Sequence, residues 1–224
     1  MHRQFLLLLG ATEASSTYGH GACVAPAGVD ELRRLSRLSC KDGDHVAMHS
    51  EIELKEKTSR RLGPRHELKL QLISFRVILS VAVSNQGHIN LEEAQALLRY
   101  VRWILRSKTR LCRRIVILVD SQVVIWAVTK GRSGSAPLNR LLRKLAAVTF
   151  AGGLILHCIF VPSAHNPSDW PSRGGPATWP EALRRPRGRV WETNKRLRRE
   201  LEELRRERTH LEGMLRKDGF FDPD

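Results

Sequence analysis

Three short runs rich in β-branched and other apolar residues stand out in the middle of the chain. Residues 75–83 form the first run and end at a turn signal, Ser-Asn-Gln-Gly, in residues 84–87. Residues 115–119 form a continuous apolar run, which is typical of a strand at the centre of a sheet covered on both faces. Residues 154–161 form the third. The pattern therefore predicts three strands, separated by segments of different periodicity.

The segments between these runs have apolar residues at helical spacing. After Asn90, which can cap a helix, Leu97, Val101 and Ile104 recur three or four residues apart. Residues 122–128 are typical of a short helix, and residues 137–151 of a longer one that ends at a pair of glycines. Strands that alternate with helices in this order predict an α/β layer architecture.

The remainder of the chain divides into three parts with weaker or different patterns. Residues 1–69 have irregular alternation and a highly charged stretch, so we expect a poorly ordered N-terminal region there. Residues 70–175 form the α/β domain, and residues 176–188, with several prolines and glycines, form a linker. Residues 189–217 predict a basic coiled-coil-like helix.

The C-terminal helix has a heptad seam. Its positions alternate steps of four and three residues, as in a coiled coil: Val190, Asn194, Leu197, Leu201, Leu204, Arg208, Leu211 and Leu215. The seam favours a parallel homodimer through residues 190–215. A helix folded onto its own domain and an arm that follows a phosphate backbone through paired arginines are the alternatives.

The extreme N-terminus has a basic start followed by the apolar run of residues 5–9, and residues 1–22 therefore have the order of a short secretory signal. The apolar run is short for this purpose, and no clear small-x-small cleavage motif follows closely. We expect a core segment or a translated upstream fragment instead, and an intracellular protein, nuclear or cytoplasmic. No run approaches the roughly 20 apolar residues of a membrane span.

Charge gives the first indication of a partner. The chain of 224 residues has 38 Lys and Arg against 23 Asp and Glu, a net charge of +15. Such a balance favours polyanions, nucleic acid above all, because binding releases condensed counterions. The four cysteines show no CxxC spacing, so a zinc site is not expected.

Three acidic residues follow the predicted elements at positions where a metal-dependent nuclease needs them. Glu93 lies at the start of a helix, Asp120 directly follows a strand, and Asp169 lies in a turn after the last strand. Carboxylates of this kind can converge in space and bind hard cations such as Mg²⁺. Each also has a purely structural explanation: a helix N-terminal acid for Glu93, a helix cap formed by Asp120-Ser121, and a turn residue for Asp169.

Four short motifs occur in order on these elements: His88-Ile89-Asn90 with Glu93, then Val119-Asp120-Ser121-Gln122, then Lys130-Gly131-Arg132-Ser133, then Asn166-Pro167-Ser168-Asp169 with Arg173. Together they resemble the ribonuclease H domain of retroelement polyproteins, in particular of DIRS-like elements, which carry a reverse transcriptase. The resemblance covers roughly residues 70–175.

The resemblance implies a ribonuclease H-like mixed sheet of five strands with flanking helices and an endonuclease, a hydrolase of the RNA strand in RNA–DNA hybrids. Two Mg²⁺ ions, or Mn²⁺, would be held by four carboxylates, among them Glu93, Asp120 and Asp169. His165 lies near where the family carries a loop histidine that assists product release; a solvated turn histidine is the alternative.

Further residues of the motifs are candidates for contacts with nucleic acid. Lys130, Arg132, Ser133 and Ser135, with Arg173, can hold backbone phosphates, although a plain flexible loop explains the same residues. Trp126 is expected in the core, and Trp170 is the better candidate for an exposed stacking surface.

The sequence departs from the family pattern at one important point. The family's first carboxylate lies on an opening strand, and no such motif is evident. Asp42, Asp44, Glu51 and Glu53 fall in the expected region without a convincing strand around them, and Glu92 can compete with Glu93. A second hypothesis is therefore a catalytically impaired relic that binds nucleic acid or self-associates.

Overall fold

The computed structural model describes residues 3–39, 44–48, 64–68, 70, 74–84 and 87–175. The predicted linker, residues 176–188, and the predicted coiled-coil-like helix, residues 189–217, lie outside the described residues. The sequence prediction for these segments, including the homodimer through residues 190–215, is therefore not addressed by the fold.

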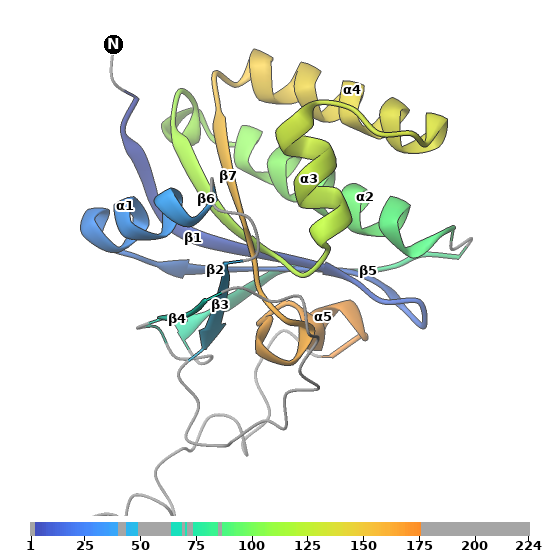
Figure 1. Cartoon of the computed structure of the whole chain (residues 1–224), viewed down its shortest axis with the longest axis horizontal. Coiled ribbons are helices and arrows are strands. Elements are labelled where there is room, and N and C mark those ends of the chain that lie inside the picture. Colours follow the sequence, from blue (N-terminus) through green and yellow to red (C-terminus); the bar gives the residue numbers. More distant parts are fainter. Residues whose placement is uncertain are drawn as a thin grey trace, which may run out of the picture. The chain divides into compact units, whose positions relative to one another are not determined.

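The described part is a mixed sheet with helices on both faces (Figure 1). The sheet has the strand order β4-β3-β7-β6-β1-β2-β5. The strands are β1 (Phe5–Ala14), β2 (Gly19–Pro26), β3 (His45–Met48), β4 (Arg65–Leu68), β5 (Arg76–Ala82), β6 (Arg114–Val119) and β7 (Ile155–Phe160). The predicted α/β architecture, a mixed sheet with flanking helices, is confirmed.

One strand, β2, runs opposite to all the others. β2 pairs antiparallel with β1 on one side and with β5 on the other, whereas β1, β6, β7, β3 and β4 pair in parallel. The five strands β5-β2-β1-β6-β7 thus form the mixed five-stranded sheet that the resemblance implies. β3 and β4 extend the sheet beyond β7. α1 (Val29–Leu38) precedes these two strands in the chain.

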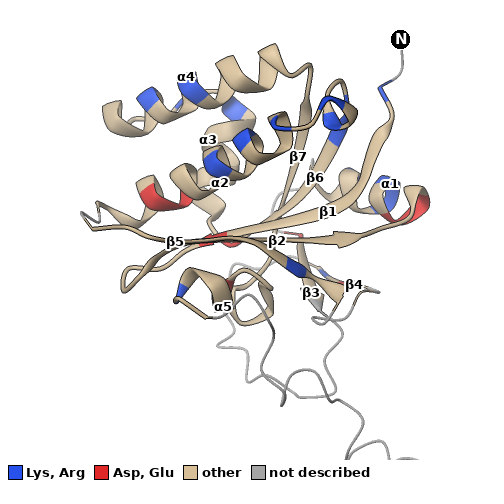
Figure 2. Ribbon diagram, turned by 180° about the vertical axis from the view of Figure 1, so that it is seen from behind, with Lys and Arg blue, Asp and Glu red and all other residues tan. Residues whose placement is uncertain are grey.

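The helices form a layer on each face. α2 (Ile89–Leu105), α3 (Gln122–Lys130) and α4 (Ala136–Ala151) lie on one face, where α4 packs against α2. α1 and the short α5 (Asp169–Ser172) lie on the other. Figure 2 shows the same layers from behind. Two short 3-10 helices, η2 (Lys108–Arg110) and η3 (Ser163–His165), follow α2 and β7. Among the described residues no helix could span a membrane.

Strand β6 shows why two layers of helices are needed. Ile115, Ile117 and Val119 contribute to the core under α2 and α3, whereas Val116 and Leu118 contribute to the core on the α1 side. All five are fully buried, because successive side chains of a strand point to opposite faces. The prediction of a central strand covered on both faces is therefore confirmed.

The prediction of a poorly ordered region over residues 1–69 is wrong for the described part of that region. β1 lies between β2 and β6, in the centre of the sheet, and Leu9 and Ala11 are fully buried. The pattern was hard to read because β1 and β2 are buried on both faces and contain many small residues. Such strands show no alternation of apolar and polar positions.

The helix boundaries also correct one detail. His88, not Asn90, is the N-cap of α2, and its Nδ1 accepts a hydrogen bond from the Asn90 N–H at 3.3 Å. Ser121 caps α3 and Ser135 caps α4 in the same way, each accepting from a backbone N–H three residues later.

Small residues in β2 allow α5 to lie directly on the sheet. A Cβ added to Gly21 would lie 2.5 Å from the Ser168 carbonyl oxygen and 2.5 Å from the Ser172 nitrogen, which are backbone atoms that cannot rotate away. The Ser80 hydroxyl on the neighbouring β5 donates a hydrogen bond to the Pro171 carbonyl at 2.8 Å. The position of α5 on the sheet thus depends on a glycine.

We expect Gly21→Ala to lower the free energy of unfolding by about 1–3 kcal/mol, the cost of overpacking a close contact. Gly28→Ala is the control, because nothing lies within 4 Å of a Cβ at that position and Gly28 has a negative φ of −71°. Urea unfolding followed by circular dichroism measures both. Equal stability of the two variants would contradict the close packing of α5 on β2.

Candidate active site

Two neighbouring parallel strands bring two acids to the same edge of the sheet. Glu13 lies next to the end of β1, and Asp120 directly follows β6. Since Thr12 pairs with Val119 in the parallel ladder, the next residue on each strand is Glu13 and Asp120, side by side. Glu13 is only 3% exposed. Glu13 is therefore an acid on the opening strand, next to Asp120, where the sequence prediction had none.

The first turn of α2 adds the third acid. Glu93 is 3% exposed, and its Oε1 accepts a hydrogen bond from the Ala14 N–H at 2.8 Å, which ties the helix to the end of β1. Its neighbour Glu92 points elsewhere: one oxygen accepts from the Gly87 N–H at 2.8 Å and the other lies 2.8 Å from His20 Nε2. Glu93, not Glu92, thus belongs to the site.

The turn that follows β7 leads into α5, and together they position the fourth acid, Asp169. Asn166 donates its side-chain N–H to the Thr12 carbonyl at 3.0 Å and its backbone carbonyl accepts from the Asp169 N–H at 3.0 Å. Asp169 is therefore held beside β1. On the same side, the Ser163 hydroxyl donates to Glu13 Oε1 at 2.7 Å.

The three predicted acids, Glu93, Asp120 and Asp169, are thus brought together. The pair Asp120-Ser121 does cap α3, but through the hydroxyl of Ser121 and not through the carboxylate of Asp120. Asp169 does begin α5, but its carboxylate is next to Glu13 and raises the pKa of that residue. Glu93 lies in a helix first turn and reaches into the site as well.

Burial and mutual repulsion govern the charges of this cluster. Burial, with the charges of Asp120 and Asp169, raises the pKa of Glu13 to about 11. Burial and Asp120 raise the pKa of Glu93 to about 9. Burial also raises the pKa of Asp120 to about 6, although contacts with Glu93 and Glu13 oppose this shift.

Several carboxylate oxygens of the cluster are buried without a donor. Glu13 Oε2, Glu93 Oε2 and Asp120 Oδ1 have no hydrogen-bond partner. Ionised carboxylates only accept hydrogen bonds, so these buried oxygens stay unsatisfied until a proton or a cation binds to them.

An all-oxygen donor set of this kind fits a hard divalent cation such as Mg²⁺ or Mn²⁺. Among the described side chains, no three His, Cys, Asp or Glu residues already surround one point as a complete ligand set. Asp120 lies close enough to Glu13 and Glu93 to raise the pKa of both, and Asp169 lies close enough to raise those of Glu13 and Asp120. A bound cation would draw the oxygens of these acids together.

The other acids suggested by the sequence do not join the cluster. Asp44 lies at the start of β3, where its carboxylate is 2.8 Å from His66 Nε2. Asp42, Glu51 and Glu53 lie outside the described residues. The sequence does not single out Glu13, because the apolar run before it has the order of a short secretory signal. The useful signal was an apolar run, then an acid, then the turn residues Ser15 and Ser16.

His165 is not on an open loop. It ends η3 and is only 5% exposed, directly before Asn166, which holds the turn against β1. The alternative prediction, that His165 is a solvated turn histidine, is therefore wrong. A role in product release stays a prediction.

The predicted phosphate-binding residues occupy two places. Lys130, Arg132 and Ser133 lie together at the end of α3 and in the loop before α4, whereas Arg173 lies next to α5, 2.8 Å from Asp169. Two hydroxyls have local structural roles, since Ser133 accepts from the Ser135 N–H at 3.2 Å and Ser135 caps α4. Lys130 and Arg132 are exposed.

No protein-family model and no curated protein matches this chain. One solved structure with similarity is LC11-RNase H1, isolated from compost by a metagenomic approach. It is 12% identical, covers 72% of this chain and 86% of its own, and superposes with a TM-score of 0.39. At this level of similarity the function of one chain cannot be transferred to the other.

The raised pKa values predict how stability depends on pH. Glu13 and Glu93 are protonated in the fold at neutral pH but ionised in the unfolded chain, so the folded state binds more protons and stability falls as pH rises. Their stabilising contribution is complete below a pH of about 4.5 and is lost as pH rises toward the folded pKa values. The pKa of His20 and His157 is lowered by burial, so both are neutral above a pH of about 7.

Between pH values of about 7 and about 9, in EDTA, we expect the free energy of unfolding to fall by several kcal/mol, because each acid that is protonated only in the fold contributes about 1.4 kcal/mol per pH unit. Asp120→Asn should flatten this dependence, because it removes the charge that opposes ionisation of Glu93. Urea unfolding at both pH values measures the difference. A wild-type stability that stays constant or rises would contradict the clustering of the acids.

Proposed function

We propose that this chain is a ribonuclease H-like endonuclease that hydrolyses the RNA strand of RNA–DNA hybrids with Mg²⁺ or Mn²⁺. The observation that carries the proposal is the convergence of Glu13, Glu93, Asp120 and Asp169 from two strands and two helices of a mixed sheet. Glu13 and Glu93 are almost fully buried, and the neighbouring charge of Asp120 raises the pKa of both. Acids with pKa values perturbed in this way often mark a functional site.

Divalent cations would be held by Glu13, Glu93, Asp120 and Asp169, and when bound they supply a water of lowered pKa and neutralise charge on the phosphodiester. The chain's own residues position this chemistry. The Ala14 N–H orients the carboxylate of Glu93, and the Ser163 hydroxyl orients that of Glu13. Arg173, 2.8 Å from Asp169, keeps a positive charge at the rim where a phosphate arrives.

The excess of positive charge supports a nucleic-acid substrate. The chain has a net charge of +15, although its proposed catalytic cluster is acidic. Lys and Arg residues lie along α2 and α4 (Figure 2). A positive surface attracts the polyanion, and the acids then bind cations at the scissile bond.

The alternative of a catalytically impaired relic rested on the missing first carboxylate. Glu13 supplies that acid on an opening strand, so the enzyme is the better proposal. The order of the four sequence motifs further supports an origin in a retroelement polyprotein with a reverse transcriptase. That origin is part of the proposal and rests on the motifs alone.

Adjacent acids provide a matched test of cation binding. We expect excess Mg²⁺ or Mn²⁺ to raise the melting temperature of the wild type, since a cation bound only by the folded state at about 100 times its Kd adds about 2.7 kcal/mol. Glu93→Gln should lose most of this shift, whereas Glu92→Gln, whose carboxylate contacts His20, should keep it. Differential scanning fluorimetry measures all three. Equal shifts in both variants would place the cation elsewhere.

Cleavage tests the reaction itself. We expect the full chain with Mg²⁺ or Mn²⁺ to cut the labelled RNA strand of a hybrid and to leave its DNA strand intact. Asp120→Asn should slow cutting at least about a hundredfold, because several kcal/mol of charge stabilisation are lost. Asp30→Asn is the control, an exposed acid on α1 that pairs with Arg33. If the wild type binds the hybrid without cutting it, the proposed endonuclease activity is wrong and the catalytically impaired, nucleic-acid-binding protein becomes the better hypothesis.

A further inference from the structure

A groove of about 600 Å³ opens along the outer side of α3, apart from the four carboxylates. Its walls come from α3 and from the loop that leads to α4. The lining residues are Gln122, Val123, Trp126, Ala127, Lys130, Arg132, Ser133 and Gly134. None of them is acidic. The groove therefore combines an apolar floor with positive charge.

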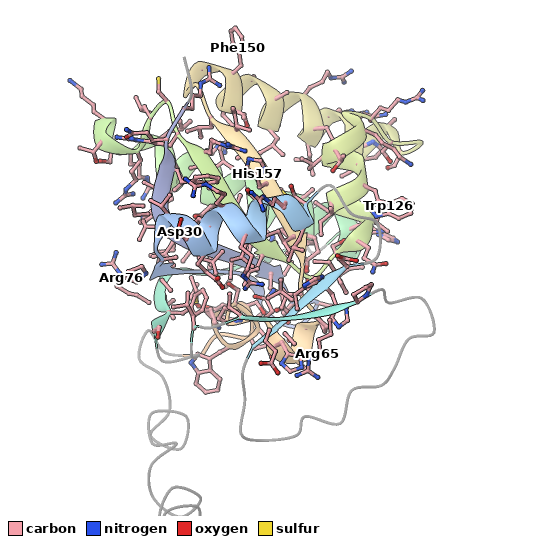
Figure 3. The ribbon with its side chains drawn as sticks, turned by 60° about the vertical axis from the view of Figure 1, so that its left-hand side comes forward. Asp30, Arg65, Arg76, Trp126, Phe150 and His157 are labelled. Carbon is pink, nitrogen blue, oxygen red and sulfur yellow. The ribbon has the colours of Figure 1, made fainter. Side chains whose placement is uncertain are left out.

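Trp126 is the main feature of the floor. The sequence prediction that it lies in the core is wrong, because the side chain is 48% exposed and projects from the outer side of α3 (Figure 3). Val123, one turn earlier, is 51% exposed. By contrast Trp170, the residue expected to be exposed, packs against the core on the α5 side. An exposed indole beside an aliphatic side chain offers a flat surface for another ring.

Positive charge surrounds this surface. Lys130 Nζ lies 4.9 Å from the centre of the Trp126 ring, and Arg132 is exposed at the same end of the groove. From Ser121 to Ser168 the sequence contains no Asp or Glu, but five cations: Lys130, Arg132, Arg140, Arg143 and Lys144. The last three are exposed on α4. A ligand of this surface should thus carry several negative charges.

The groove is continuous in the chain with the four-carboxylate cluster. Asp120 is followed by the cap Ser121, and Gln122 is both the first residue of α3 and part of the groove lining. Trp126 is six residues beyond Asp120, or about 9 Å along a helix axis. One nucleotide spans a comparable length, so a strand held at the carboxylates can reach the groove.

We propose that the groove binds an unpaired segment of nucleic acid, with a base stacked on Trp126 against Val123 and its phosphates next to Lys130 and Arg132. Every base offers an aromatic face, so such binding tolerates many sequences. The place of the groove beside the carboxylates gains its meaning from the proposed nuclease function, but binding in the groove does not require cleavage. The site would hold a single-stranded end or flap next to the paired substrate.

An acidic peptide is the competing ligand for a positively charged groove. The carboxylates of such a peptide would pair with Lys130 and Arg132, but they would place no ring on the exposed indole of Trp126. Nucleic acid uses both features, because each nucleotide joins a ring to a phosphate at fixed spacing. The combination of ring and cations therefore favours nucleic acid.

Fluorescence anisotropy of a labelled oligothymidylate of about twelve nucleotides tests the proposal on the full chain with Mg²⁺. We expect Trp126→Ala to weaken binding about tenfold, the effect of losing one stacked base. Trp126→Phe should retain most of the affinity but lose the quenching of tryptophan emission that binding causes. Lys130→Gln and Arg132→Gln should each reduce the slope of log affinity against log salt by about 0.7.

Phe150→Ala is the matched control, since Phe150 on α4 is 90% exposed and lies outside the groove. It should bind as the wild type does. Equal affinities of Trp126→Ala and the wild type, or an equal loss in Phe150→Ala, would overturn the proposal. Displacement of the oligonucleotide by a polyaspartate peptide that itself binds through Trp126 would overturn it in favour of a protein partner.

Cleavage of a blunt RNA–DNA hybrid by the wild type separates this proposal from the nuclease. Binding of oligothymidylate that depends on Trp126, without any cleavage, would support the groove and overturn the proposed reaction. Cleavage of the hybrid, with oligothymidylate binding that does not depend on Trp126, would support the proposed reaction and overturn the groove. The two conclusions therefore fail independently.

Discussion

Repulsion between four acids is the constraint on which the rest of this structure depends. Glu13, Glu93, Asp120 and Asp169 are brought to one place where burial and like charge disfavour ionisation, and three of them have raised pKa values. A fold tolerates such a cluster only when the surrounding elements hold it firmly. The mixed sheet does so, because the ends of two adjacent parallel strands cannot separate without breaking the ladder.

The elements around the cluster are also fixed by contacts that do not involve a carboxylate. α5 lies against the small residue Gly21, and Ser80 holds its backbone. The turn before it is tied to β1 by the side chain of Asn166. α2 is buried along the core, so the Ala14 N–H meets Glu93 at a fixed place. Apolar packing and backbone hydrogen bonds thus provide the stability that the acids reduce.

The distribution of charge divides the molecule between two tasks. The acids that could bind cations lie at one edge of the sheet, whereas the segment from Ser121 to Ser168 contains only positive charges. These cations lie on α3, α4 and the loop between them. An acidic centre next to a basic surface suits a polyanion that is held by its phosphates and acted on by cations at one bond. Trp126 adds a ring surface to the basic side.

The sequence by itself indicated the strands and helices between residues 75 and 161 and singled out Glu93, Asp120 and Asp169, because helical and strand periodicity are local and each acid lies next to a recognisable element. Glu13 and β1 were decided only by tertiary structure: a strand of leucines and small residues buried on both faces has no alternating pattern, so nothing local marks it as the centre of a sheet. Tertiary contacts likewise decide between Glu93 and Glu92: Glu93 accepts a hydrogen bond from the Ala14 N–H at the end of β1, whereas Glu92 contacts His20. The exposure of Trp126 depended on the packing of α3, which leaves one side of that helix uncovered, and helical spacing alone cannot say which side that is.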